Sequence, residues 1–182
     1  MALTSTVYNF DIDLADADRG VYETLALRVA RHPSETEDYL VARVLAYCLE
    51  YGDGLAFSAG GLSDPDEPAL SVRDLTGALR AWIDVGAPDA ARLHRASKGA
   101  ARVAVYLQKD PTQYLRQLAG ERIYRAEAIA LHALDRGLLA ALVARLERRT
   151  RFSLSVSGRH LFVAIGAETF DGPVETLAVP AA

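Results

Sequence analysis

The first thirty residues alternate between apolar and polar positions with a period of two. A period of two is typical of half-buried strands, and Arg19-Gly20 between two such runs predicts a turn. We therefore expect an antiparallel hairpin at the N-terminus. Its apolar positions are Tyr8, Phe10, Ile12, Leu14, Leu25, Leu27 and Val29.

A helical pattern follows this hairpin. Ser34 can cap the first free N–H groups of a helix, and Glu37 lies three positions later, as in a capping box. Apolar residues then recur at helical spacing up to Gly52, which predicts the end of the helix. The apolar face of this helix consists of Leu40, Val41, Val44, Leu45 and Cys48.

The middle of the chain predicts two strands joined through a helix. Residues 55–57 form a short strand candidate, and the loop over residues 60–68 is rich in glycine, proline and acid. Residues 79–85 and 103–107 have the apolar character of strands, and a helix is predicted between them over residues 88–98. This spacing predicts a crossover whose two strands are parallel.

The last third of the chain predicts two helices and a second hairpin. Helices are expected over residues 112–118 and 136–149, with a strand over residues 129–133 between them. Strands over residues 152–156 and 161–165 flank Ser157-Gly158, which predicts the hairpin turn. Because no linker interrupts the sequence, residues 1–182 are expected to form one α+β domain with a mixed sheet.

Composition and charge limit the classes of protein to which this chain can belong. With 51% apolar residues in 182, the chain can build one core without disulfides, and its single cysteine cannot form an internal bridge. The N-terminus lacks the basic start and apolar stretch of a signal peptide, so we expect a cytoplasmic protein outside the membrane. A net charge of −4 is not typical of a non-specific nucleic-acid binder, so any phosphate must be held locally.

Four acidic residues are candidates for chemistry. Glu35 lies near the predicted helix start, Asp66 and Glu67 lie in the acidic loop, and Asp84 lies near the end of a strand. Carboxylates from separate elements are suitable ligands for Mg²⁺, which keeps water and substrate phosphate as further ligands. Asp84 is the most informative of them, because a carboxylate in an apolar strand is costly unless it is paired or functional.

Each of the other acids also has a purely structural explanation. A carboxylate in the first turn of a helix, as expected for Glu35, is stabilised by the helix dipole. Acids such as Asp66 and Glu67 are ordinary turn formers in a loop. The chain contains 20 basic residues, and its only lysines are Lys98 and Lys109. Lysine at position 98 is therefore informative, since an arginine cannot be deprotonated in its place.

A set of short motifs, in this order, resembles the bacterial YaeQ family. The motifs are His32-Pro33-Ser34-Glu35-Thr36, Asp66-Glu67-Pro68, Trp82-Ile83-Asp84-Val85-Gly86 with Pro88-Asp89, and Arg92-Leu93-His94-Arg95-Ala96-Ser97-Lys98. The resemblance covers essentially the whole chain and implies a compact variant of the PD-(D/E)XK nuclease fold. It implies a restriction-endonuclease-like core of helix, strand, strand, strand, helix and strand, flanked by N-terminal and C-terminal β-hairpins.

The resemblance also implies roles for the acidic residues. Glu35 would be the carboxylate of the helix, Asp66 the acid of the "PD" element, and Asp84 the acid of the "(D/E)XK" element. Glu67 joins Asp66 and Asp84 as a candidate ligand of Mg²⁺ or Mn²⁺, which would be the cofactor.

This chain departs from the family pattern two residues after Asp84. The element has lysine at the position that Gly86 occupies here. Some relatives of the superfamily place the lysine on the following helix, so Lys98 becomes the expected source of the ammonium group. Arg92 and Arg95 on the same helix are then expected to contact the substrate.

Three functional hypotheses follow from these residues. The first is a metal-dependent phosphodiesterase acting on nucleic acid, with Asp84 and Asp66 on the metal, Glu35 positioning metal or water, and Lys98 stabilising charge. The second is a non-catalytic module that binds nucleic acid or protein, which the missing lysine and the net negative charge favour. The third is an adaptor that adds a partner strand to an exposed hairpin, which predicts an apolar edge and no metal pocket.

Overall fold

The N-terminal hairpin is confirmed in the computed structural model, which describes residues 4–59 and 64–182. Strands β1 (Thr6–Asp16) and β2 (Val21–Arg31) pair antiparallel over their full length, with Thr6 opposite Arg31. The apolar positions at Phe10, Ile12 and Leu14 are buried, as the alternation predicted. Both strands therefore place one apolar face on the core.

Helix α1 (Glu37–Leu49) begins later than the sequence predicted. Its N-cap is Thr36, whose Oγ1 accepts a hydrogen bond from the Tyr39 N–H at 3.4 Å, so the capping box at Ser34 is wrong. Ser34 instead bonds to Nδ1 of His32 at 2.6 Å, and this local contact competes with capping. Glu35 consequently precedes the helix and does not lie in its first turn.

The predicted crossover is confirmed in the middle of the chain. Strand β5 (Leu79–Val85) and strand β6 (Arg102–Leu107) pair in parallel, with α2 (Ala90–Gly99) between them in sequence. Asp89 caps α2 by accepting from the Arg92 N–H at 2.7 Å. The short strands β3 (Leu55–Phe57) and β4 (Leu70–Arg73) pair antiparallel beside β5, and residues 60–63 of the predicted loop lie outside the described residues.

The C-terminal third confirms the predicted hairpin and corrects one helix boundary. Strands β8 (Arg149–Ser157) and β9 (His160–Ile165) pair around the Ser157-Gly158 turn. Helix α4 (Arg136–Val143) ends six residues before the predicted end. The following segment is drawn into the sheet, where the Asn9 N–H donates to the Arg148 carbonyl at 2.8 Å and β1 pairs with β8. After residue 143, pairing with β1 therefore prevails over the helical pattern of the sequence.

Three further elements complete the chain. Helix α3 (Pro111–Leu118) and strand β7 (Ala130–Leu134) lie close to their predicted positions, with a 3₁₀ turn over Ala126–Ala128 between them. Strand β10 (Glu168–Leu177) was not predicted. Its sequence contains Gly172-Pro173, which hides the strand pattern because proline is normally excluded from strand interiors.

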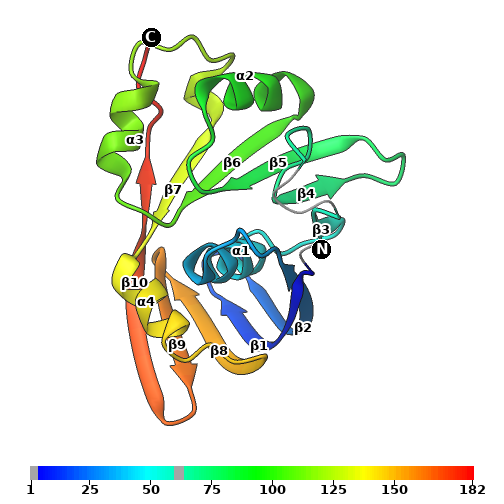
Figure 1. Ribbon diagram of the computed structural model, residues 1–182, viewed down its shortest axis with the longest axis vertical. Coiled ribbons are helices and arrows are strands. Elements are labelled where there is room, and N and C mark those ends of the chain that lie inside the picture. Colours follow the sequence, from blue (N-terminus) through cyan, green and yellow to red (C-terminus); the bar gives the residue numbers. More distant parts are fainter. Residues whose placement is uncertain (1–3, 60–63) are drawn as a thin grey trace.

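Strand β10 joins two halves of one mixed sheet. Its first half pairs with β9 and its second half with β7, which gives the order β2-β1-β8-β9-β10-β7-β6-β5-β4-β3. The ten strands curve into a nearly closed barrel around α1, while α2 and α3 cover the outside of the β5–β7 half (Figure 1). Strands β8 and β9 of the C-terminal hairpin thus lie inside the sheet. Among the described residues, only β2 and β3 are end strands of the sheet.

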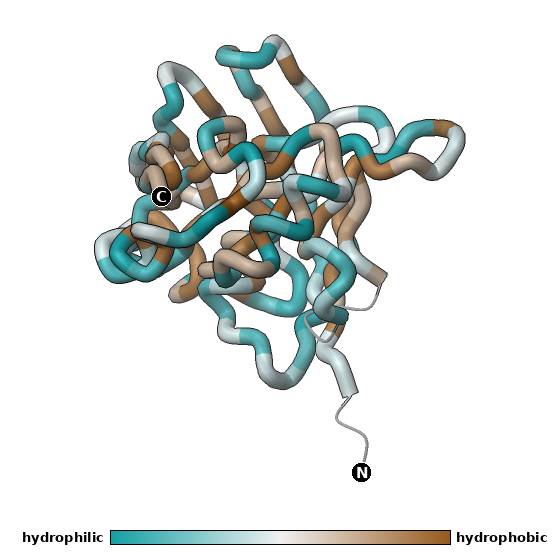
Figure 2. The backbone as a smooth tube through the Cα atoms, turned by 90° about the horizontal axis from the view of Figure 1, so that it is seen from above, coloured by the Kyte–Doolittle hydropathy of each residue, from teal (hydrophilic) through white to brown (hydrophobic). Residues whose placement is uncertain are grey.

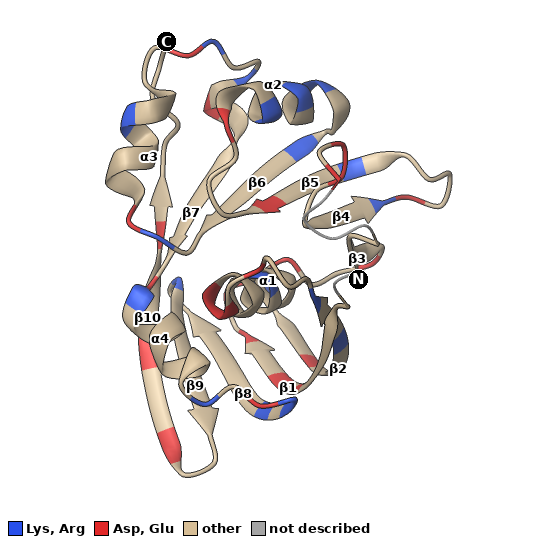
Figure 3. Ribbon diagram, viewed as in Figure 1, with Lys and Arg blue, Asp and Glu red and all other residues tan. Residues whose placement is uncertain are grey.

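Two apolar cores hold these layers together. The larger core contains α1 and strand residues from both halves, such as Ile12 of β1 and Ile83 of β5. The smaller core lies between the other face of β5–β7 and the helices α2 and α3, and includes Leu93 and Leu118. Hydrophobic positions gather toward the middle of the molecule and hydrophilic ones in the outer loops (Figure 2), and charged residues of both signs are spread over the outer elements (Figure 3). No helix in the described part of the chain is long and apolar enough to span a membrane.

Candidate functional site

A cavity of about 340 Å³ opens between the start of α1, the loop before β4, and the end of β5. Its lining contains four carboxylates and two guanidinium groups, a formal excess of two negative charges. The charged lining residues are Glu35, Arg43, Asp64, Glu67, Asp84 and Arg92. We call this cavity the acidic pocket.

Asp84 at the end of β5 is bound by an arginine through both of its oxygens. The Arg92 Nε–H donates to Oδ2 at 2.8 Å and Nη2 donates to Oδ1 at 2.8 Å. The Trp82 indole N–H also donates to Oδ2 at 2.8 Å. Asp84 is only 3% exposed, and the three donors offset the cost of burying its charge. In turn, the hydrogen bonds that Arg92 donates to Asp84 raise the pKa of Arg92.

Arg92 also fastens the acidic loop to α2. Its Nη1 donates to the Pro65 carbonyl at 2.7 Å and its Nη2 to the Glu67 carbonyl at 2.8 Å. The guanidinium carbon lies 5.1 Å from the centre of the Trp82 ring, within cation–π range. One side chain therefore joins β5, α2 and the loop at the rim of the acidic pocket.

A second buried ion pair lies across the pocket. Arg43 Nη2 donates to Oε2 of Glu35 at 2.7 Å, and the two residues are 4% and 3% exposed. Among the described residues, Glu35 Oε1 and Arg43 Nε have no hydrogen-bond partner. Burial raises the pKa of Glu35, although the charge of Arg43 opposes this shift. Burial also raises the pKa of the neighbouring Tyr39 to about 12, so Tyr39 lines the pocket as a neutral phenol.

Gly86 explains why this site has no lysine two residues after Asp84. Its φ is 94°, a left-handed conformation that favours glycine. A Cβ atom at this position would make an ordinary van der Waals contact of 3.5 Å with the Tyr39 ring, so the constraint is the backbone conformation. A lysine here would therefore strain the backbone at the wall of the pocket.

The structure brings only part of the predicted site together. Glu35, Glu67, Asp84 and Arg92 line the acidic pocket, and Ser58 donates to Glu67 Oε2 at 2.8 Å. Asp66, Lys98 and Arg95 are exposed and do not line it.

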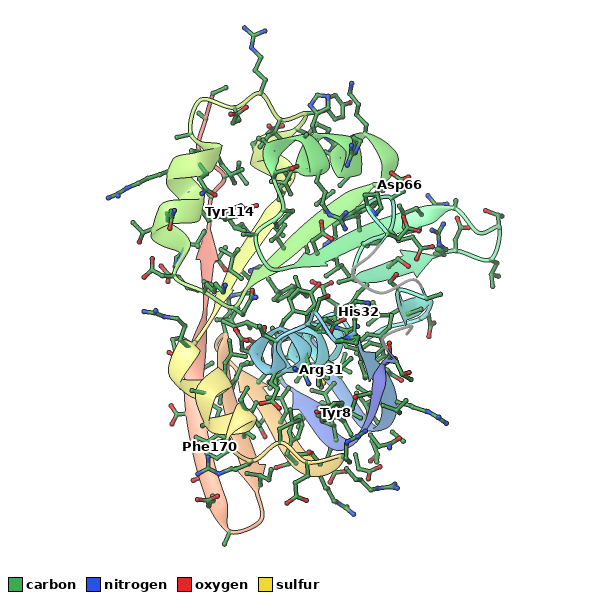
Figure 4. All side chains as sticks on the ribbon, in the orientation of Figure 1. Tyr8, Arg31, His32, Asp66, Tyr114 and Phe170 are labelled. Carbon is green, nitrogen blue, oxygen red and sulfur yellow. The ribbon has the colours of Figure 1, made fainter. Side chains whose placement is uncertain are left out.

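Asp66 and Lys98 lie outside the acidic pocket. Figure 4 shows Asp66 on the side of the loop near α2, apart from His32, which follows β2. The backbone N–H of Asp66 donates to Asp64 Oδ1 at 2.9 Å. Asp64, and not Asp66, is the aspartate of this loop that lines the pocket. Lys98 lines a separate groove beside α2, together with Arg122 and Tyr124.

Comparison with known proteins now identifies the family. Residues 1–172 match the family described as "YaeQ protein". The chain belongs to the YaeQ family. The "Uncharacterized protein YaeQ" of Escherichia coli strain K12 and that of Salmonella typhi are each 38% identical over 106 residues. The matched segment covers 58% of this chain and 58% of each of these relatives.

Two solved YaeQ structures share the whole fold. The crystal structure of YaeQ from Pseudomonas syringae superposes with a TM-score of 0.85 at 32% identity and covers 96% of both chains. That of YaeQ from Xanthomonas axonopodis pv. citri gives a TM-score of 0.87 at 30% identity, covering 97% of this chain and 100% of the other. The overall fold of this chain is therefore similar to that of these two YaeQ proteins.

The divalent metal implied by the YaeQ resemblance does not fit the described arrangement. No group of three or more His, Cys, Asp or Glu side chains is placed to hold a metal ion in residues 4–59 and 64–182. The Asp84 carboxylate faces three N–H donors, and the guanidinium of Arg92 takes the place of a cation beside it. We therefore derive no chemical step through a metal.

Asp64, Arg43 and Tyr39 line the YaeQ pocket but were not among the residues predicted for the site. Arg43 follows Leu40 and Val41 in the apolar face of α1, and a buried charge in such a face requires a partner, which is a usable signal. Tyr39 carried no comparable signal, because an aromatic residue at a helix start is ordinary. The pairing of Arg92 with Asp84 was also not predicted, because Arg92 was expected to contact the substrate.

Proposed function

We propose that this chain is a non-catalytic binding module whose acidic pocket receives a cationic group of a protein partner. The observation that carries the proposal is the charge of the pocket: its two arginines are already paired with Asp84 and Glu35, while Asp64 and Glu67 have no cationic partner among the described residues. An ammonium or guanidinium group bound in the pocket would balance the negative charge of Asp64 and Glu67.

The walls of the pocket also suit a lysine or arginine side chain. Ala69, Val85 and Pro88 line the cavity together with the Tyr39 ring, so an aliphatic stem would meet apolar surface. The carboxylates of Asp64 and Glu67 would then meet the charged head group. We take the fold itself to be a variant of the restriction-endonuclease-like core, because α1, β3, β4, β5, α2 and β6 follow the expected order.

Titration with capped amino acids tests this proposal. We expect N-acetyl-lysine amide and N-acetyl-arginine amide to shift the NMR signals of Tyr39, Glu67 and Gly86, whereas the neutral isosteres norleucine and citrulline leave them unchanged. Glu67→Gln should weaken binding several-fold, because it removes one uncompensated charge. Equal binding of arginine and citrulline, or no binding of either cation, would overturn the proposal.

A second candidate is the metal-dependent phosphodiesterase. It is favoured by the convergence of carboxylates from three segments, Glu35 before α1, Glu67 in the loop and Asp84 in β5, on one cavity. It requires Arg92 to leave Asp84, so that Mg²⁺ or Mn²⁺ could take its place. Incubation with single-stranded DNA, duplex DNA and RNA in either metal distinguishes the candidates: cleavage lost in Asp84→Asn but retained in Asp66→Asn would replace the binding module with the nuclease.

A further inference from the structure

Strand β2 is an open edge of the sheet and is much longer than the edge at the other end. Among the described residues it pairs only with β1, over 11 positions without a bulge, whereas β3 has 3 residues (Figure 1). Edge strands are commonly shortened, bulged or interrupted by proline, because their free backbone groups can pair with another chain. Strand β2 contains no bulge and no proline, so its edge is available for pairing.

The free backbone groups of β2 belong to its even-numbered residues. The Asn9 N–H faces β8, where it donates to the Arg148 carbonyl at 2.8 Å. Because backbone groups alternate along a strand, the even residues of β1 face β2, and the odd residues of β2 face β1. The Ala30 carbonyl agrees with this assignment, since it accepts from Arg43 Nη2 outside the β1–β2 ladder at 2.9 Å. The residues whose N–H and C=O groups point away from β1 are Tyr22, Thr24, Ala26, Arg28 and Ala30.

The charges of β2 are arranged symmetrically about Leu27. On the inner face of the strand, Glu23 lies four positions before Leu27 and Arg31 lies four positions after it. Within the described residues neither charge forms a salt bridge. In an antiparallel pair of β2 strands centred on Leu27, Glu23 of each copy therefore faces Arg31 of the second copy. Opposite charges that face each other across two strands stabilise the pairing.

Neighbouring registers lack this complementarity. Centring the two strands on Ala26 would place Glu23 opposite Val29, and centring them on Arg28 would place that guanidinium opposite itself. Centring on Leu27 places even residues opposite even residues, as the free backbone groups require. It also gives two ion pairs at the ends and apolar pairs between them, where the half-buried Leu27 is covered by Leu27 of the second copy.

We propose that the protein forms a symmetric homodimer in which two β2 strands pair antiparallel about Leu27. A twofold interface requires one surface to be complementary to itself. The edge of β2 meets this requirement in its backbone groups, its apolar residues and its charges, whereas an unrelated partner strand would not require the symmetry of Glu23 and Arg31. The interface is separate from the acidic pocket, because no residue of β2 lines that cavity.

Charge reversal followed by light scattering tests the dimer. We expect the unaltered protein to have twice the mass of one chain. Glu23→Arg and Arg31→Glu should each give monomers, because each variant places like charges opposite each other at both ends of the interface. An equimolar mixture of the two variants should recover the dimer, since every arginine then faces a glutamate. Glu121→Arg and Arg116→Glu, at exposed positions outside β2, are the matched controls and should remain dimers.

Two further variants test the register. Ala26→Pro should give a monomer, because it removes an outward N–H that the β1–β2 ladder does not use. On oxidation, Leu27→Cys should form a disulfide between copies, since position 27 meets itself at the twofold axis. Thr24→Cys should not, because its two copies would lie about 20 Å apart. The native Cys48 is fully buried and does not interfere.

Circular dichroism melting verifies that each variant is folded. A single-chain mass for the unaltered protein at all concentrations would overturn the proposal. A dimer that persists in Ala26→Pro, or the failure of mixed Glu23→Arg and Arg31→Glu chains to associate, would overturn it equally.

Discussion

Three buried charged residues of this chain depend on their ion-pair partners. Asp84, Glu35 and Arg43 are each under 5% exposed, and each has a charged partner. A buried ion pair gains little over an apolar pair, but removing one partner leaves an uncompensated charge and costs far more. The pairs are therefore sensitive points for both stability and function.

The Arg92–Asp84 pair can be tested by truncation. We expect Arg92→Ala to destabilise the fold by about 3 kcal/mol, because the buried Asp84 side chain would lose its cationic partner and keep only Trp82 as donor. Urea unfolding measures the effect, and Arg28→Ala at an exposed position serves as the control, with a change of about 0.5 kcal/mol or less. A loss for Arg92→Ala as small as that of the control would contradict the importance of the pair.

His132 in β7 should make stability depend on pH. Burial, together with the charge of Arg159, lowers its pKa to about 4, and Arg159 Nη2 lies 3.0 Å from its Nδ1. Between pH 6.5 and 4 the unfolded chain takes up a proton that the folded chain does not. Stability should therefore be complete above pH 6.5 and fall by about 3 kcal/mol as the pH drops to 4.

Denaturant unfolding at several pH values, with His132→Gln as the comparison, measures this contribution. Glutamine can still accept a hydrogen bond from Arg159 but does not titrate. We expect a shallower fall in stability for the variant between pH 6.5 and 4. Identical slopes in the two proteins would show that His132 is not responsible.

Three helices of this chain begin at an aspartate N-cap that can be recognised in the sequence. Asp89, Asp110 and Asp135 each accept a backbone N–H at the start of α2, α3 and α4. Such caps are local, and they explain why these helix starts lie close to the predicted ones. Helix ends and strand β10 were predicted less well, because they depend on pairing with distant strands.

Gly172 in β10 and the cap of α4 should be coupled. A Cβ atom at Gly172 would lie 2.5 Å from Cβ of Asp135 and 2.8 Å from its Oδ1, the atom that caps α4. Gly172→Ala should therefore displace the cap and destabilise the fold by about 2 kcal/mol.

Gly99 at the end of α2 is the opposite case, since a Cβ there would meet nothing within 4 Å. We expect Gly99→Ala to stabilise the fold by about 0.5 kcal/mol, because alanine loses less backbone entropy. Thermal melting of both variants is the measurement. Equal effects of the two substitutions would show that contact with Asp135 does not constrain β10.

The whole molecule is organised around α1. The larger core joins α1 to strands of both sheet halves, and β10 runs through both. Because both halves pack on α1, separation of either half from α1 would expose apolar residues of this shared core. The two halves are therefore expected to unfold together.

Coincident unfolding curves would support this cooperativity. Trp82, the single tryptophan, lies in β5, so its fluorescence reports on one half, while far-ultraviolet circular dichroism reports on all elements. We expect the same midpoint from both probes. Leu40→Ala, at a fully buried position of α1, should lower both midpoints together and cost about 3 kcal/mol.

Leu75→Ala, at a fully exposed position, should change neither midpoint and is the matched control. Two separate transitions, or a shift in only one probe for Leu40→Ala, would show that the halves are independent.

Elements whose causes are local could be predicted from the sequence. Period-two and helical patterns, caps and glycine turns depend on residues a few positions apart, so both hairpins, the crossover and the four helices were predicted from them. Glu35, Glu67 and Asp84, which were named from the sequence, line one cavity, and their roles as metal ligands or catalytic groups stay a prediction.

The partners of those acids depend on contacts between distant segments of the chain. Arg92 reaches Asp84 across 8 positions and the Pro65 carbonyl across 27, and no local pattern records such contacts. The same holds for β10, whose strand character comes from pairing with β9 and β7, and for Lys98, which lines a groove separate from the acidic pocket. Long-range packing selects partners by position in space, and for this reason the sequence named the charged groups but not their pairing.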